Sequence, residues 1–122
     1  MQPQLIEGPA AWRGSELAAD PSWRRTLTAE EVAALQRAAA AAEARGIALT
    51  GFPAHEFPVP ELTPLFAWLA GQLENGPGVA RVCGMPVDRL ARDQLRRLFW
   101  GFCVNLGTPM YQTAAGEILG EV

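Results

Sequence analysis

Apolar residues recur at the spacing of an α-helix in three segments of the chain. The first segment follows Thr28, which stands three residues before Glu31 as in a capping box, and it stops before Gly46. In the second, Thr63 suits the N-cap and Pro64 the first helical position, although a start near Glu61 also fits the pattern. The third segment stops before Gly107. The pattern predicts helices over about 28–45 with Val32, Leu35, Ala39 and Ala42 on one side, about 63–75 with Leu62, Leu65, Phe66, Leu69 and Leu73, and about 91–106 with Leu95, Leu98, Phe99 and Phe102.

The three predicted helices differ in the size of their apolar residues. The first has a narrow stripe of small residues, which predicts shallow burial on an outer face. The second carries leucines and Phe66, so we expect it to be buried more deeply. The third has the strongest core signal.

Only short stretches of the chain fit β-strands. Val79–Cys83, an apolar run between two glycines, predicts a strand of about five residues. Ile47–Leu49 is compatible with a short strand, and Ile118–Val122 resembles the beginning of another. Prolines predict a loop over 51–60. Residues 1–27 show no period, which predicts an irregular arm that its tryptophans, Trp12 and Trp23, pin to a surface.

These elements predict a single α+β domain over 1–122. It consists of an irregular arm at 1–27, two helices at 28–75 and a strand, helix and strand at 76–122. The strands are too few and too short to close a core by themselves, so we expect a helical layer that covers a sheet.

Composition and charge argue against two classes of binding partner, nucleic acids and membranes. Ten basic and thirteen acidic residues give a net charge of −3 without a long basic run, which makes nucleic acid an unexpected partner. The chain has neither a signal-like start nor a long uncharged apolar run, so we expect a cytoplasmic protein without a membrane partner.

The residues that commonly carry catalysis or bind metals are sparse. Cys83 and Cys103 lack the spacing of a zinc site, and packing as buried thiols is the favoured interpretation. His55, the one histidine, stands beside Glu56 in the proline-rich loop and not at the helical spacing of a metal pair. We therefore predict no catalytic residue and no metal ligand in this chain.

The last third of the chain carries a family resemblance. Its features are the strand and turn at Val79–Asp88, the aromatic pair Phe99 and Trp100 in a helix, and the turn Leu106–Pro109 that follows the helix. In this order they resemble the front part of the TauD/TfdA-like (taurine dioxygenase, clavaminate synthase-like) family of Fe(II)/2-oxoglutarate-dependent dioxygenases.

The resemblance implies a fold, a reaction, and an iron site that lies outside this chain. The family continues into a double-stranded β-helix, or jelly roll, that binds iron through two histidines and one carboxylate. It couples the oxidative decarboxylation of 2-oxoglutarate to hydroxylation of a small organic substrate. With one histidine, the 122-residue chain cannot form that iron site, so we expect it to bind neither Fe(II) nor 2-oxoglutarate alone and to be inactive alone. The remainder of the barrel is the implied partner.

The resemblance also implies which residues contact substrate. Tyr111 and Gln112, just beyond the turn, are the first candidates, and Thr108 is a weaker one. The competing interpretation is that Tyr111 packs its ring and satisfies its hydroxyl locally, while Thr108 caps the turn.

Two functional hypotheses follow. The chain is either the N-terminal part of such an oxygenase, supplying scaffold and part of the substrate lip, or a non-catalytic α+β interaction module derived from that family. The first predicts exposed apolar surface on the side of Leu95, Phe99 and Phe102.

Overall fold

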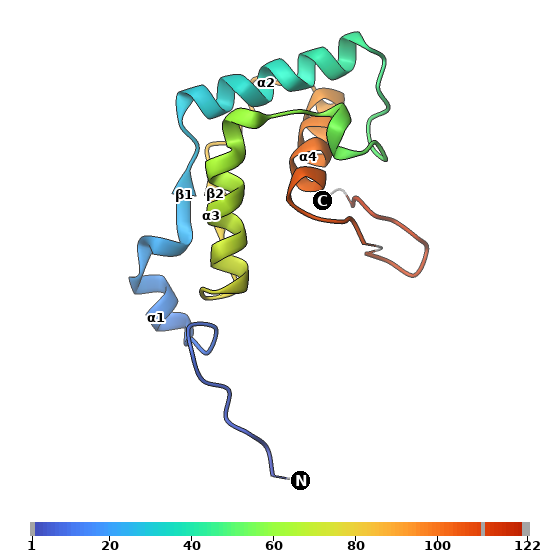
Figure 1. Ribbon diagram of the computed structural model, residues 1–122. Helices are drawn as coiled ribbons and strands as arrows, with labels where there is room; N and C mark the ends of the chain where they lie inside the picture. The colour runs from blue at the N-terminus through green and yellow to red at the C-terminus, as the bar shows by residue number, and fades with distance from the viewer. Residues whose placement is uncertain (1, 111, 121–122) are drawn as a thin grey trace.

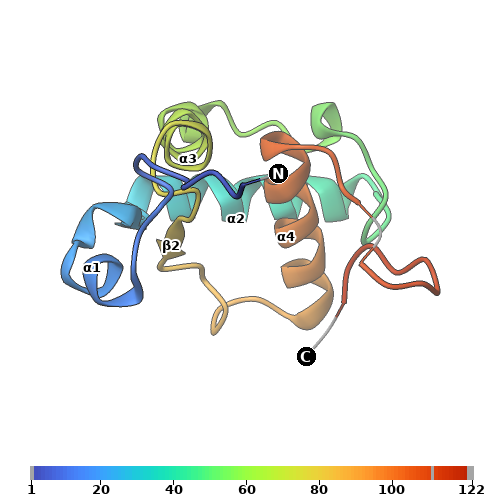
Figure 2. The ribbon, with the colours of Figure 1, turned by 90° about the horizontal axis from the view of Figure 1, so that it is seen from below.

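The computed structural model describes residues 2–110 and 112–120, which form an α+β structure dominated by helices. The elements are α1 (Gly14–Ala19), η1 (Pro21–Trp23), β1 (Arg24–Thr26), α2 (Ala29–Ala44), η2 (Ala54–Glu56), η3 (Pro60–Leu62), α3 (Thr63–Glu74), β2 (Arg81–Cys83) and α4 (Arg92–Leu106). Helix α2 lies across α3 and α4, which both extend from it on the same side (Figure 1). Seen from below, α2 forms the layer behind these two helices (Figure 2).

The ends of α2 follow the local signals in the sequence. The Thr28 and Glu31 side chains each accept a hydrogen bond from the other residue's backbone N–H, both at 3.1 Å. At the other end Gly46 adopts φ 70°, and its N–H donates to Glu43 O while the next N–H donates to Ala42 O. This is the left-handed cap that glycine favours. The predicted capping box and the predicted stop at Gly46 are both confirmed.

The other two predicted helices are also confirmed, with one change at the start of α3. Thr63 was the expected N-cap, but Leu62 occupies that position and Thr63 is the first helical residue. The Thr63 hydroxyl donates to Pro60 O at 2.8 Å, in the preceding 3₁₀ turn. The short turn η3 therefore leads directly into the helix.

The sheet contains one strand that the sequence pattern missed. β1 pairs with β2 in parallel, with Arg24 opposite Arg81, Arg25 opposite Val82 and Thr26 opposite Cys83. The prediction that residues 1–27 are irregular is therefore wrong for α1 and β1. Ile47–Leu49 forms no strand, and neither does 118–120, while residues 121 and 122 lie outside the described residues.

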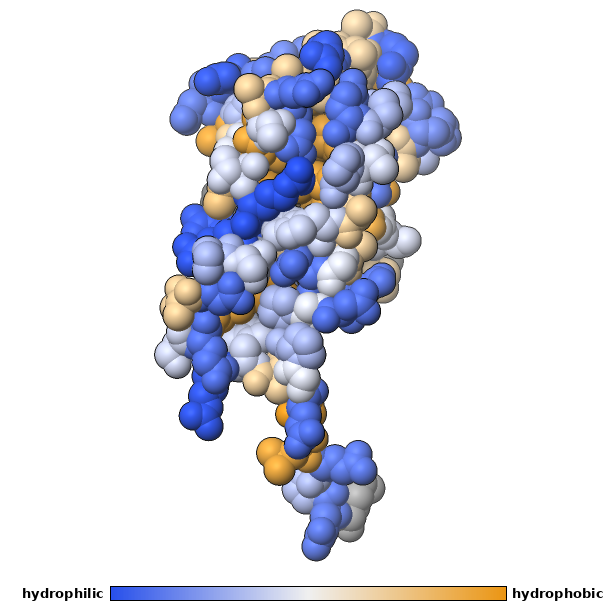
Figure 3. All heavy atoms as spheres, turned by 60° about the vertical axis from the view of Figure 1, so that its left-hand side comes forward, coloured by the Kyte–Doolittle hydropathy of each residue, from blue (hydrophilic) through white to orange (hydrophobic). Residues whose placement is uncertain are grey.

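Both tryptophans of the N-terminal arm are anchored through their indole N–H groups. Trp12 donates to Pro77 O and Trp23 donates to Leu17 O, each at 2.7 Å. The expectation that the arm is pinned is confirmed at these two points. Before Trp12 the chain leaves the body of the molecule, where Leu5 and Ile6 are largely exposed (Figures 1 and 3).

The core is centred on the face of α2 that meets α4. Leu35 and Ala42 are fully buried there, and Ala34 and Ala39 nearly so. The predicted shallow burial of this helix is wrong, because its small side chains let the neighbouring helix approach closely. Only Leu65 and Leu69 are buried on α3, so the predicted order of depth is reversed.

The loop before α3 supplies a large part of the core through its aromatic residues. Phe57 is fully buried, and Phe52 stacks on it with ring centroids 6.2 Å apart. An added Cβ at Gly101 in α4 would lie 2.2 Å from the Phe57 ring, so only glycine fits there. The Asn105 amide donates to Phe57 O at 2.9 Å and secures the loop to the helix.

The buried side of α4 differs from the predicted stripe. Leu98 and Phe102 are buried as the helical pattern predicts, but Phe99 is 49% exposed and Trp100 is buried in its place. The predicted exposed surface on the side of Leu95, Phe99 and Phe102 is therefore wrong for Phe102, and Leu95 is only partly exposed. Trp100 reaches the interior because its indole N–H donates to Phe52 O at 2.9 Å. Of the aromatic pair on which the family resemblance rests, Trp100 therefore lies in the core and Phe99 at the surface.

None of the helices described here has the length and apolar character needed to cross a membrane.

Glu31 joins the cap of α2 to the sheet, which leads to a stability prediction. It is buried, and its Oε2 lies 3.3 Å from Arg25 Nη1 on β1. Replacing Glu31 with alanine removes the carboxylate that accepts from the Thr28 N–H and leaves a partly buried guanidinium without its carboxylate, which should cost about 1–3 kcal/mol of unfolding free energy. Urea denaturation checks this, with the exposed neighbour substitution Glu30→Ala as control. Equal losses in the two variants would contradict the assigned role.

Candidate binding pocket between α4 and the C-terminal segment

An apolar pocket of about 450 Å³ lies between α4 and the segment that follows it. Residues of both elements line it: Phe99, Trp100, Cys103, Thr108, Pro109, Met110, Gln112, Ile118, Leu119 and Gly120. In two views the segment leaves the end of α4 and runs out beside the helix (Figures 1 and 2). The volume is within the range of small-molecule sites.

Helix α4 contributes one wall because Phe99 and Cys103 stand one turn apart on it. Trp100, fixed by its hydrogen bond to Phe52 O, presents part of its ring to the same space. Phe99 and Met110 are 49% and 68% exposed, so two large apolar side chains at the pocket remain open to solvent. A rigid helix thus supplies the aromatic surface, and an irregular segment supplies the opposite wall.

A small hydrogen-bonded loop shapes the C-terminal segment. The Gln112 N–H donates to Glu117 O at 2.6 Å, and the Glu117 N–H donates to Thr113 Oγ1 at 3.2 Å. This closure returns the chain toward α4, so that Ile118 and Leu119 pack against the core. The apolar residues after the loop therefore reach the pocket without a strand.

Two of the three predicted substrate-contact residues line this pocket. Thr108 and Gln112 are both part of its wall, and the Gln112 side-chain amide donates to Met110 O at 3.0 Å. Tyr111 lies outside the described residues. Contact of these residues with a substrate stays a prediction, while their common location is now established. Cys103 and Met110 could not be recognised as pocket residues from the sequence, because nothing in their spacing distinguishes them from ordinary core positions.

The pocket has the character of a binding surface. None of its described lining residues is Asp, Glu, Lys, Arg or His. Cys83 and Cys103 are free thiols that are only partly buried, so the prediction of two buried thiols is wrong in its degree of burial. Partial burial still raises the pKa of the Cys103 thiol, so the thiol stays protonated near neutral pH and is a poor nucleophile. General acid–base catalysis needs a group that exchanges protons near the working pH. The lining therefore suits an uncharged apolar group better than a proton-transfer reaction.

The Cys103 environment predicts slow alkylation. Because burial raises its pKa, the thiolate fraction at pH 8 should lie below that of a free thiol, and iodoacetamide should modify it more slowly than it modifies glutathione. Peptide mass spectrometry after timed alkylation measures this rate. A rate equal to that of glutathione would show that the thiol is freely ionisable.

The residues present do not fit the iron site that the family resemblance implies. The side chain of His55 is 77% exposed, and its Nε2 lies 3.6 Å from Glu56 Oε1. No group of three His, Cys, Asp or Glu residues suited to a metal ion occurs within 2–110 and 112–120. A site of two histidines and one carboxylate cannot be formed from these side chains. No chemical step at iron is therefore assigned to this chain.

Comparison of the sequence with models of known protein families finds no match, and comparison with curated protein sequences finds none either.

Proposed function

We propose that this chain is the N-terminal part of a TauD/TfdA-like Fe(II)/2-oxoglutarate-dependent oxygenase. In this proposal it supplies helical scaffold and part of the substrate lip, and a jelly-roll barrel supplied by the remainder of the enzyme binds iron and 2-oxoglutarate. The observation that carries the proposal is the pocket beside α4. Thr108 and Gln112, which the sequence resemblance implies for substrate contact, lie there with the aromatic pair Phe99 and Trp100.

The pocket chemistry supports the role of a lip. Iron with 2-oxoglutarate would supply the oxidising chemistry, so the lip needs only to position an organic substrate and exclude water. Phe99 and Met110 offer apolar contact, and the Thr108 hydroxyl and Gln112 amide offer polar groups for orientation. A cytoplasmic location accompanies this proposal.

The exposed apolar side chains at the pocket support the proposal that another domain covers it. Phe99 and Met110, which both line the pocket, are exposed large apolar residues. Exposed apolar groups that lie together commonly mark sites covered by another part of a protein. The barrel is the proposed occupant of this side.

The gene and a kinetic experiment test the proposal. The reading frame beyond codon 122 should encode a His-x-Asp pair and a later histidine and arginine. A stop codon directly after Val122 would contradict this. In the protein so encoded, Gln112→Ala and Thr108→Ala should raise KM for the organic substrate by roughly tenfold, because each removes a polar contact. KM for 2-oxoglutarate should stay unchanged, and Gln4→Ala on the exposed arm serves as control.

A second candidate function is a non-catalytic interaction module. The observation in its favour is that the described residues enclose a core of their own, with Phe57, Leu35 and Leu65 fully buried. Dye binding separates the candidates, because an oxygenase fragment without its barrel should bind a hydrophobic dye at the Phe99 and Met110 surface. A monodisperse chain that leaves the dye unbound favours the module.

A further inference from the structure

The two strands place an arginine pair on one open face of the sheet. Arg24 stands opposite Arg81 in the parallel register, so both side chains project from the same face. Both residues are exposed, and so is Thr26, the next residue along that face of β1. Like charges in directly opposed positions destabilise strand pairing. The arrangement therefore works against a sheet that is already only three residues long.

Arg25, the next residue of β1, differs from Arg24 because it has a carboxylate partner. Arg25 projects from the opposite face, where Glu31 lies 3.3 Å away and balances its charge. Within residues 2–110 and 112–120, neither Arg24 nor Arg81 has such a carboxylate partner. The charge of Arg25 is thus balanced within the chain, whereas the charges of Arg24 and Arg81 on the other face are not balanced by a described residue.

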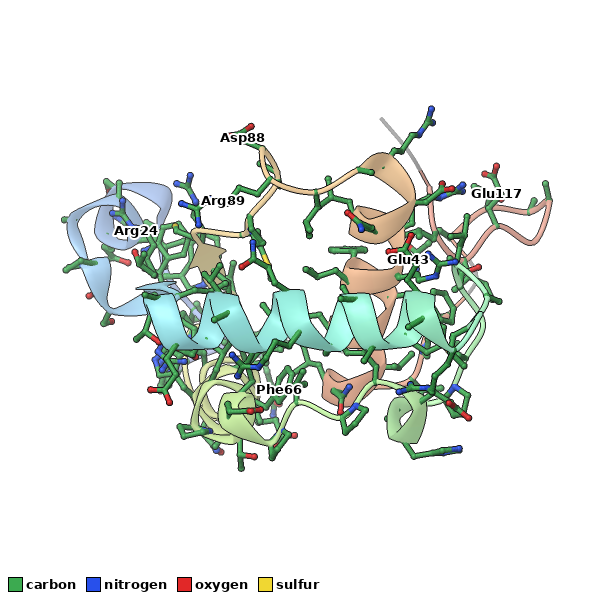
Figure 4. The ribbon with its side chains drawn as sticks, turned by 90° about the horizontal axis from the view of Figure 1, so that it is seen from above. Arg24, Glu43, Phe66, Asp88, Arg89 and Glu117 are labelled. Atoms are coloured by element: carbon green, nitrogen blue, oxygen red, sulfur yellow. The ribbon has the colours of Figure 1, made fainter. Side chains whose placement is uncertain are left out.

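Arg24 is also held in place. Its guanidinium carbon lies 5.0 Å from the centroid of the Trp23 ring, and Trp23 is itself fixed through its hydrogen bond to Leu17 O. A cation over an aromatic face keeps its N–H groups available at its edge for carboxylate oxygens. Figure 4 shows Arg24 toward the N-terminal end of α2, at the same end as Arg89 and the neighbouring Asp88, whereas Glu43 and Glu117 lie toward the other end.

We propose that Arg24 and Arg81 form a docking site for an acidic segment of a partner protein. Carboxylates of that segment bind the two guanidinium groups and remove the repulsion between them. Sites for small molecules are concave, whereas this pair stands on an exposed strand face, which suits a polypeptide surface. This inference is independent of the oxygenase proposal.

Fluorescence anisotropy with a labelled hexaglutamate peptide at low salt tests the site. The full chain should bind the peptide, and Arg24→Gln and Arg81→Gln should each weaken the affinity by about tenfold, since each removes charge-assisted hydrogen bonds. Arg37→Gln is the matched control, because it removes the same charge from α2, where Arg37 pairs with Glu61. Its effect should stay below about twofold, as expected for general electrostatic attraction alone.

Three outcomes would overturn the proposal. The first is no binding by the unmodified chain, and the second is an equal loss in all three variants. The third is competition by citrate at the same carboxylate concentration as the peptide, which would indicate a site for small anions.

A folding measurement separates docking from a structural role. Because Arg81→Gln relieves a repulsion, its urea midpoint should equal or exceed that of the unmodified chain. A clearly lower midpoint would show that Arg81 stabilises the fold itself and would overturn the assignment.

Discussion

Replacing Gly101 with alanine should lower the free energy of unfolding by about 2–4 kcal/mol, although alanine is the better helix former by about 1 kcal/mol. The added methyl group would lie 2.2 Å from one carbon of the Phe57 ring and 2.5 Å from two others. Phe57 is fully buried, and its backbone carbonyl accepts a hydrogen bond from Asn105 of α4, so the ring cannot simply move away. Urea denaturation followed by circular dichroism measures the loss.

Gly71 in α3 provides the matched control. An added Cβ there meets no heavy atom within 4 Å, so Gly71→Ala should raise the free energy of unfolding by about 0.5–1 kcal/mol through helix propensity alone. The two substitutions are chemically identical and should have opposite signs. Equal effects would mean that the contact between Phe57 and α4 does not limit the packing.

Phe57→Ala should have the largest effect on stability, a loss of about 3–5 kcal/mol. The ring is fully buried between α4 and the loop before α3, and it stacks on Phe52. Phe99→Ala is the matched control, because this ring is 49% exposed and its removal should cost less than about 1 kcal/mol. Thermal and urea unfolding measure the loss of stability in each variant, and equal losses would contradict the assignment of Phe57 to the core and Phe99 to the surface.

Combining the substitutions tests the contact directly. In the Phe57→Ala background the space beside Gly101 is open, so Gly101→Ala should no longer destabilise the chain and could recover part of the loss through helix propensity. A double-mutant cycle measures this coupling. Additive losses would show that the two residues act independently.

The three longer helices, α2, α3 and α4, could be predicted because their signals are local. Thr28 and Glu31 lie within one turn, and Gly46 directly follows the helix that it ends. Such caps depend on few distant contacts, so the sequence pattern alone predicts the ends of α2, α3 and α4 to within about one residue.

Apart from the six-residue helix α1, the features that could not be predicted depend on distant partners. β1 has only three residues and exists through its pairing with β2, so it leaves no detectable alternation of its own. The deep burial of Ala39 and Ala42 results from the close approach of α4, which a stripe of small residues does not distinguish from a shallow surface. The requirement for glycine at position 101 could not be predicted, because it comes from the contact with the Phe57 ring, which is distant in the sequence.

The pocket was predictable only in part. The turn after α4 and its resemblance to a known family drew attention to Thr108 and Gln112, and both lie in its wall. The wall formed by α4 could not be predicted, because it depends on which side of α4 faces the core. Periodicity assigned Phe99 to the interior, whereas Trp100 is buried through its hydrogen bond to Phe52 O and Phe99 is left at the pocket.

The central claim, that this chain is the front part of an iron oxygenase and contributes binding surface without the metal site, is tested most directly by succinate formation. The 122-residue chain and the longer polypeptide encoded by its reading frame would each be incubated with Fe(II), 2-oxoglutarate and oxygen. We predict that succinate and Fe(II) binding are detected only with the longer polypeptide. Tight Fe(II) binding together with succinate release by the 122-residue chain alone would contradict the account.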